Sequence, residues 1–169
     1  MYTLYIANKN YSSWSLRPWV LMSELQIPFR EEIRPFRTQN NFDQFRTFSP
    51  TGKVPCLVDE GRVIWDSLAI TEYLYEQYPA IWPDGLDART FARCAAAEMH
   101  AGFSALRNSY SMNVGVTVEL HHRSADLARD LERLGELWLE GLDRFGGPFL
   151  AGNRFTAADA FFCPVAFRI

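Results

Sequence analysis

The chain has 169 residues, 48% of them hydrophobic and 15% aromatic, so it can bury a core as one domain or as two small ones. Its 17 basic and 20 acidic residues give a net charge of -3 without a basic cluster, which argues against nucleic acid as a partner. No signal peptide, membrane-length apolar run or CxxC pair is recognisable, so we expect a soluble, cytoplasmic protein with reduced thiols and no membrane partner.

The first 80 residues alternate short apolar runs with helical patterns. In chain order, these patterns predict a strand over 3–7, a helix over 15–25, a strand over 29–33, a short helix over 42–47, paired strands over 56–59 and 62–65, and a helix over 67–78. A βαβ unit followed by a helix, a hairpin and a last helix is the element order of a thioredoxin-like layer. The predicted first domain is therefore thioredoxin-like and covers residues 1–80.

Residues 79–86 contain two prolines and a glycine, which is typical of a linker. The sequence beyond the linker predicts an all-helical domain over residues 87–169, so the expected fold class is α/β plus all-α. Two apolar stripes indicate a helix over 87–108 and a second long helix; they run through Phe91, Ala95, Met99 and Phe103, and through Leu127, Leu131, Leu134, Trp138 and Leu142. Both stripes indicate the core of a helical bundle rather than a cofactor site.

Serines gather at the turn between the first strand and the first helix, at positions 12, 13 and 15. A hydroxyl at this turn would lie near a helix N-terminus, where free amides and the helix dipole favour an anion. Ordinary capping by Ser13 or Ser15, with Pro18 tolerated in the first helical turn, explains the same residues. The turn alone supports both interpretations.

Two further positions bracket the predicted hairpin. Val54-Pro55 precedes a strand, where a cis bond would leave the Val54 main chain free to pair with a ligand; a trans proline in an ordinary turn is the alternative. Asp66 and Ser67 open the next helix, where they could cap the helix or leave its amides to a ligand carboxylate.

Taken in order, four motifs resemble those of the cytosolic glutathione transferases, and the resemblance covers essentially the whole chain. The segment 12–17 resembles the active-site serine motif of the zeta class, 53–55 resembles the Gln-Val-Pro segment with its cis-proline, 66–70 resembles the glutamyl-binding motif, and 156–159 resembles the capping box of the core helix. Trp14 stands where the zeta motif has cysteine, so the subclass is left open. Family members continue for several more helices, so the resemblance implies a helical domain that is incomplete at its C-terminus.

The resemblance implies a glutathione S-transferase that activates the glutathione thiol as a thiolate for attack on a small hydrophobic electrophile, as in detoxification. Ser12 is the expected donor to the sulfur, with Ser13 as the next candidate. A free thiol is only a few per cent ionised at neutral pH, so a donor that lowers its pKa by about two units makes most of it nucleophilic.

The remaining expected contacts match the other groups of glutathione, the co-substrate. Val54 would pair its main chain with the cysteinyl unit, Ser67 would hold the glutamyl carboxylate and Asp66 would lie near the ammonium group. Lys53 could reach the glycyl carboxylate. Two further residues are possible contacts, Gln39 and Asn40.

Other chemistries fit the residues less well. The adjacent His121 and His122 would diverge on a helix and His100 stands alone, so no metal site is expected. Cys56 reads as a small buried hydrophobe. The alternatives that stay open are a non-catalytic glutathione-binding or dimerising scaffold and a glutathione-dependent isomerase of the maleylacetoacetate isomerase type.

We also expect a homodimer that uses the helix over 67–78. Its apolar residues lie on more than one side of the helix, and exposed apolar patches commonly mark interfaces; they are Leu68, Ile70, Tyr73, Leu74, Tyr75 and Tyr78.

Overall fold

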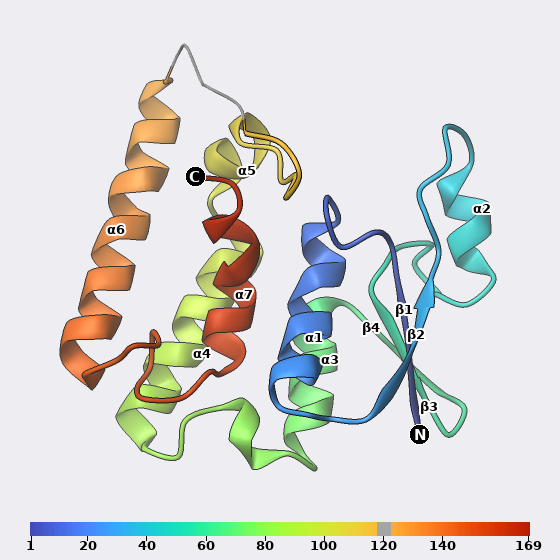
Figure 1. The fold of residues 1–169 in the computed structure, drawn as a ribbon, viewed down its shortest axis with the longest axis horizontal. Coiled ribbons are helices and arrows are strands. Elements are labelled where there is room, and N and C mark those ends of the chain that lie inside the picture. Colours follow the sequence, from blue (N-terminus) through green and yellow to red (C-terminus); the bar gives the residue numbers. More distant parts are fainter. Residues whose placement is uncertain (118–122) are drawn as a thin grey trace. The chain divides into compact units, whose positions relative to one another are not determined.

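A computed structural model describes residues 1–117 and 123–169 and divides into two units, Met1–Ile81 and Trp82–Ile169 (Figure 1). His121 and His122 lie outside the described residues. The first unit contains, in chain order, β1 (Tyr2–Ile6), α1 (Ser13–Glu24), β2 (Phe29–Ile33), α2 (Asn41–Arg46), β3 (Cys56–Asp59), β4 (Arg62–Trp65), α3 (Ser67–Tyr75) and the 3-10 turn η1 (Pro79–Ile81).

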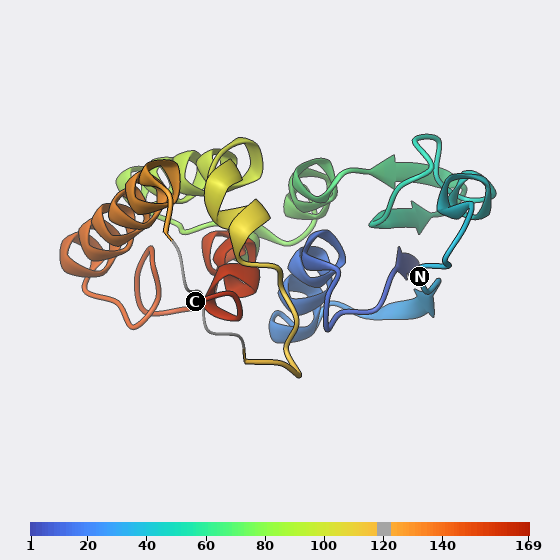
Figure 2. The same cartoon turned by 90° about the horizontal axis from the view of Figure 1, so that it is seen from above.

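The strands of the first unit form one mixed sheet in the order β2-β1-β3-β4. β1 runs parallel to β2 and antiparallel to β3, and β3 forms an antiparallel hairpin with β4. Figure 2 shows α1 and α3 side by side on one face of this sheet and α2 on the other. This arrangement confirms the predicted thioredoxin-like layer.

The side chains of β1 alternate between the two faces of the sheet, as a strand requires. Leu4 and Ile6 are fully buried. Tyr5 points to the opposite face, where its ring stacks on Phe48 at 4.4 Å between centroids, and Phe48 packs against the buried Phe45 of α2. The sheet therefore has an apolar layer on each side.

Helix α1 begins earlier than the sequence pattern predicts. Its N-cap is Ser12, so the expected capping by Ser13 or Ser15 is wrong. Ser15 lies inside the helix and is fully buried. Its hydroxyl oxygen accepts a hydrogen bond from the amide of Ala7, the residue after β1, at an N–O distance of 3.0 Å. Pro18 consequently lies beyond the first turn, within the helix rather than at its start.

The second unit is helical throughout its named elements. These are α4 (Leu86–Ala101), α5 (Ser104–Ser109), α6 (Ala125–Phe145) and α7 (Ala157–Ala166). Helix α7 packs on α4 and forms the centre of this unit, with Ala158, Phe161 and Val165 fully buried. None of the helices in the described ranges combines the length and apolar character needed to cross a bilayer.

The single helix predicted over 87–108 is wrong, because the chain breaks between α4 and α5. Gly102 ends α4 in an extended conformation, and a Cβ atom there would lie 2.8 Å from the Glu98 carbonyl oxygen. Phe103 follows with a φ of 54°, in the left-handed region that interrupts a right-handed helix. The apolar residues keep their helical spacing across this break, so the sequence periodicity does not reveal it.

The stripe predicted along α6 is correct at its start and wrong at its end. Leu127 and Leu134 are buried, but Leu142 is 37% exposed. Leu137 and Gly141 are buried instead. An α-helix has 3.6 residues per turn, so residues chosen at spacings of three and four drift around the helix and leave its buried face.

The start of α7 is held by the predicted capping box of Thr156 and Asp159. One Asp159 carboxylate oxygen accepts the Thr156 amide at 2.8 Å, and the other accepts the Leu150 amide at 2.9 Å. The Asp159 carboxylate therefore joins the preceding turn to the buried core helix.

Asp159→Ala should lower the free energy of unfolding by about 2–4 kcal/mol, because it leaves two partly buried amides unpaired and removes a helix cap. Urea unfolding followed by circular dichroism measures the change. Asp143→Ala, which removes an exposed carboxylate from α6, is the matched control and should stay within about 0.5 kcal/mol of the parent protein. A change of that small size for Asp159→Ala would contradict the structural role given to its carboxylate.

Candidate functional site

A cavity of about 470 Å³ opens in the first unit, beside the first turn of α1 and the start of α3. Both ends of the β3–β4 hairpin contribute to it, since the loop before β3 and the last residue of β4 are on its wall. The lining residues are Trp14, Thr51, Lys53, Val54, Pro55, Trp65, Asp66 and Ser67. Five of the residues singled out from the sequence thus lie on one cavity.

The loop before β3 presents main-chain groups to this cavity. The Val54–Pro55 peptide bond is cis, which confirms the cis alternative. Neither the amide nor the carbonyl of Val54 has a hydrogen-bond partner within the described residues. Val54 therefore offers one donor and one acceptor to an extended peptide.

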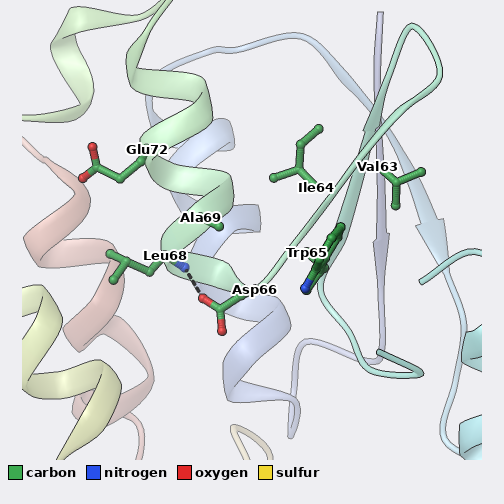
Figure 3. A pocket seen from close by; sticks show the side chains of 7 residues that line it. All are labelled: Val63, Ile64, Trp65, Asp66, Leu68, Ala69 and Glu72. Carbon is green, nitrogen blue, oxygen red and sulfur yellow. Dashed lines mark hydrogen bonds between the residues drawn. The ribbon is translucent and has the colours of Figure 1, made fainter. Parts of the chain in front are cut away.

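The opposite wall is the N-terminus of α3. Asp66 is its N-cap, with a φ of 75°, and its carboxylate accepts the Leu68 amide at 2.8 Å (Figure 3). Ser67 is 1% exposed, and its hydroxyl has no hydrogen-bond partner in the described part of the chain. A buried hydroxyl beside first-turn amides suits a carboxylate that enters the cavity.

The serine turn is arranged differently from the wall at α3. Ser12 is only 6% exposed, and its hydroxyl oxygen lies 2.9 Å from that of Ser15, with which it shares a hydrogen bond. Ser13 is the first residue of α1 and is half-buried. Trp14, not either serine, lines the cavity.

Two expected peripheral contacts lie away from this cavity. Asn40 is the N-cap of α2 and its side chain binds Asp43, while Gln39 is exposed on the preceding loop. Neither residue lines the cavity. The structure thus gives Asn40 a capping role.

Opposite charges flank the cavity. Lys53 lies exposed on the loop side and Asp66 on the α3 side. Behind the cavity, the buried guanidinium of Arg17 lies over the Trp14 ring at 4.2 Å from its centroid, which holds the indole in place. A ligand with both an ammonium group and a carboxylate would meet complementary charges.

Cys56 follows the cis-proline but is buried in β3, where its thiol contacts the Phe48 carbonyl oxygen at 3.5 Å. Burial raises the pKa of Cys56 to about 11, against a smaller lowering by the Ser49 hydroxyl. The thiol therefore stays protonated at neutral pH.

The described residues include no group of three or more His, Cys, Asp or Glu side chains that could hold a metal ion. His100 is half-buried and packs near the Phe161 ring, with 6.2 Å between ring centroids. This placement gives His100 a packing role.

A second hollow, of about 600 Å³, adjoins the cavity on the outer side of β4 and α3 (Figure 3). We call it the β4–α3 groove; it is lined by Val63, Ile64, Trp65, Asp66, Leu68, Ala69 and Glu72. Trp65 and Asp66 belong to both hollows. Apart from its two carboxylates, the lining of the groove is apolar.

Three lining residues of the cavity were not singled out from the sequence: Trp14, Thr51 and Trp65. Trp65 carried a usable signal, because a large aromatic residue at the last position of a short strand, directly before a helix cap, is well placed to line a cavity. The positions of Trp14 and Thr51 depend on the folded turn and loop.

Comparisons with known proteins agree with this geometry. Residues 11–77 match the family described as Glutathione S-transferase, N-terminal domain. A dichloromethane dehalogenase of Methylophilus leisingeri is 31% identical over 157 residues, which cover 84% of this chain and 57% of that protein. A zeta class glutathione S-transferase of Euphorbia esula is 30% identical over 124 residues, which cover 72% of this chain and 55% of that protein.

The fold is also similar to that of a solved glutathione S-transferase. The apo form of human glutathione-S-transferase T1-1 superposes with a TM-score of 0.68 at 26% identity, covering 97% of this chain and 72% of that one. The chain thus spans little more than half the length of the two curated relatives. Residues 11–77 thus match the glutathione S-transferase N-terminal domain family, and the chain as a whole is similar in sequence and fold to glutathione S-transferases.

Proposed function

We propose that the cavity binds glutathione and that the protein acts as a glutathione S-transferase. The observation that carries the proposal is the Ser67 hydroxyl, buried and without a partner in the described structure, on the same cavity as the unpaired main chain of Val54. Glutathione offers a carboxylate to the first group and a peptide unit to the second.

The charged residues beside the cavity determine how the two ends of glutathione are placed in this proposal. Ser67 and the first-turn amides of α3 hold the glutamyl carboxylate, and Asp66 lies near the glutamyl ammonium group. Val54 pairs with the cysteinyl unit. Lys53, exposed on the loop side, reaches the glycyl carboxylate.

The thiol of the bound peptide must be ionised before it can attack an electrophile. Ser12, the N-cap of α1, is the proposed donor to the sulfur, and the N-terminus of the helix adds favourable dipoles. Ser13, one residue further along the same turn, is the second candidate. A donor that favours the thiolate lowers the thiol pKa.

The proposed second substrate is a small hydrophobic electrophile. The relative named a dichloromethane dehalogenase favours an alkyl halide, in which the thiolate would displace halide from carbon. The likeness to a zeta class enzyme keeps a maleylacetoacetate isomerase type of activity as the second candidate. Binding without turnover of any electrophile would instead identify a scaffold.

We also propose a cytoplasmic homodimer, formed through the β4–α3 groove. Of the apolar residues expected to lie at the interface, Ile70 and Leu74 are fully buried in their own unit. Outward-facing Val63 and Trp65 of β4 are exposed instead and widen the apolar surface. A second copy of the chain is the proposed occupant of this surface.

Ser67→Ala should weaken glutathione binding about tenfold, because it removes a buried hydrogen bond to a carboxylate. The same change should leave the unliganded protein as stable or about 1 kcal/mol more stable, since it deletes an unpaired buried hydroxyl. Calorimetric titration and urea unfolding measure the two effects.

Asp66→Ala and Ser124→Ala are the comparisons for Ser67→Ala. Asp66→Ala should weaken both binding and stability, because its carboxylate also caps α3. Ser124→Ala removes a cap from α6 and should leave binding unchanged. Unaltered glutathione affinity in Ser67→Ala would refute the proposed placement of the glutamyl carboxylate.

Ser12→Ala should leave glutathione affinity nearly intact while cutting turnover of an activated aryl halide on the order of 100-fold, the loss expected when one donor to a developing anion is removed. Steady-state kinetics and titration of the bound thiol report the two quantities. Ser13→Ala serves as the matched variant and should retain most of the activity. The reverse ranking of the two variants would move the donor to Ser13.

Val63→Glu should convert the dimer into a monomer at micromolar concentration, because it places a charge in the apolar groove. Sedimentation velocity gives the mass of the species. Val114→Glu adds the same charge at another exposed valine and should leave the assembly unaltered. A parent protein that sediments as a monomer would rule out the proposed dimer.

A further inference from the structure

A polar cavity of about 780 Å³ lies at the far end of the β3–β4 hairpin and of α3, away from the candidate glutathione cavity. The two cavities have no lining residue in common, and the β4–α3 groove shares none with it either. Three tyrosines line this third hollow, Tyr2, Tyr73 and Tyr78, so we call it the tyrosine cavity. The proposed mechanism does not use it.

A buried carboxylate belongs to the wall of the tyrosine cavity. Asp59, the last residue of β3, is only 9% exposed. Within the described residues its carboxylate has one hydrogen-bond partner, the Tyr73 hydroxyl, which donates to Oδ2 at 2.8 Å. A carboxylate has about four acceptor sites, and a buried carboxylate is normally paired with a cation. Asp59 therefore has unused acceptor capacity beside the cavity.

The tyrosines supply neutral aromatic rings around this carboxylate. The rings of Tyr2 and Tyr78 meet edge to face, with 6.3 Å between centroids, and the Tyr2 hydroxyl donates to Oε1 of Gln77 at 2.9 Å. Burial raises the pKa of Tyr2 to about 12, with further contributions from Tyr78 and the Asp59 carboxylate, so this phenol stays protonated. Neutral phenol rings offer both π faces and hydroxyl oxygens to a cation.

The charges around the tyrosine cavity also favour a cation. Glu60 and Glu76 line it and are exposed, whereas Arg62 is the one cationic side chain among its described lining residues. The Arg62 guanidinium pairs with Glu60 at 3.5 Å, and Met1, 87% exposed, leaves its amino group to water. The last turn of α3 carries no basic residue, so no side chain there offsets the negative end of the helix dipole.

We propose that the tyrosine cavity binds a short aliphatic diamine as its diammonium ion. One ammonium group pairs with Asp59, the methylene groups contact the tyrosine rings, and the second ammonium group is held by the exposed carboxylates of Glu60 and Glu76. An ammonium group has three donors and no acceptor, which complements a wall of carboxylate and phenol oxygens. The proposal does not rest on the glutathione site.

The test is calorimetric titration of the protein with 1,4-diaminobutane at neutral pH and constant ionic strength. We expect one saturable site. The monoamine n-butylamine should bind about fivefold more weakly because it lacks the second charge, and succinate, a dianion of the same carbon length, should not bind.

Two variants separate the groups that hold the ligand. Asp59→Asn keeps the shape of the side chain and an acceptor for Tyr73 but removes the charge, so it should weaken diamine binding about tenfold or more. Glu76→Gln should weaken diamine binding about threefold and leave n-butylamine binding unchanged, because Glu76 is assigned to the second ammonium group. Glu132→Gln removes an exposed carboxylate from α6 and should change neither affinity.

Three results would overturn the proposal. Equal heats from 1,4-diaminobutane and magnesium chloride at the same ionic strength would indicate charge screening without a site. Undiminished binding in a folded Asp59→Asn protein would exclude the buried carboxylate as the partner. If Asp59→Asn does not fold, Tyr78→Leu removes one aromatic ring instead and should weaken binding about fivefold; undiminished binding there would equally contradict the proposal.

Glutathione separates this inference from the proposed function. Saturating glutathione should leave the affinity for 1,4-diaminobutane unchanged, because the two cavities have separate linings. Displacement of the diamine by glutathione would place it in the candidate glutathione cavity and overturn the inference. A protein that binds the diamine but not glutathione would refute the proposed function alone.

Discussion

The conformation of Asp66 is the constraint on which the candidate site depends. Its φ of 75° lies where residues other than glycine are uncommon and where strain of about 1–3 kcal/mol is typical. The hydrogen bond from the Leu68 amide to its carboxylate offsets part of that strain. Because the chain turns sharply here, Trp65 at the end of β4 and Ser67 at the start of α3 reach the same cavity. A relaxed backbone at this position would separate them.

The polar groups around the cavity fall into two kinds. Ser67 and the Val54 main chain are left without partners in the described part of the protein, although forming secondary structure normally pairs such groups. Ser12 and Ser15, by contrast, are bonded to each other and to the strand before them. Unpaired groups suit ground-state binding of a peptide, whereas a preorganised bonded pair suits the stabilisation of a developing charge. In the proposed function, binding and activation therefore use separate elements, α3 and the turn before α1.

The sequence predicted the thioredoxin-like layer and singled out Val54 and Ser67, which line the cavity. Strand alternation, proline conformation and helix capping each depend on only a few neighbouring residues, so they can be recognised in the sequence. It did not predict the break at Phe103, since the apolar stripe continues through Gly102 and only the left-handed φ interrupts the helix. The inward direction of the Ser12 hydroxyl was equally hidden. That direction depends on Ser15, whose hydroxyl accepts hydrogen bonds from Ser12 and from the amide of Ala7, the residue after β1. Motif spacing carries no information about which way a hydroxyl points.

Cys56 has a consequence for the redox chemistry of such a site. The candidate cavity lies next to a protein thiol whose pKa is raised by burial to about 11, so at neutral pH only about one Cys56 side chain in ten thousand is ionised. Thiol–disulfide exchange requires a thiolate as the attacking group. If the cavity binds glutathione as proposed, the neighbouring Cys56 thiol is therefore a poor partner for a mixed disulfide that would block the cavity.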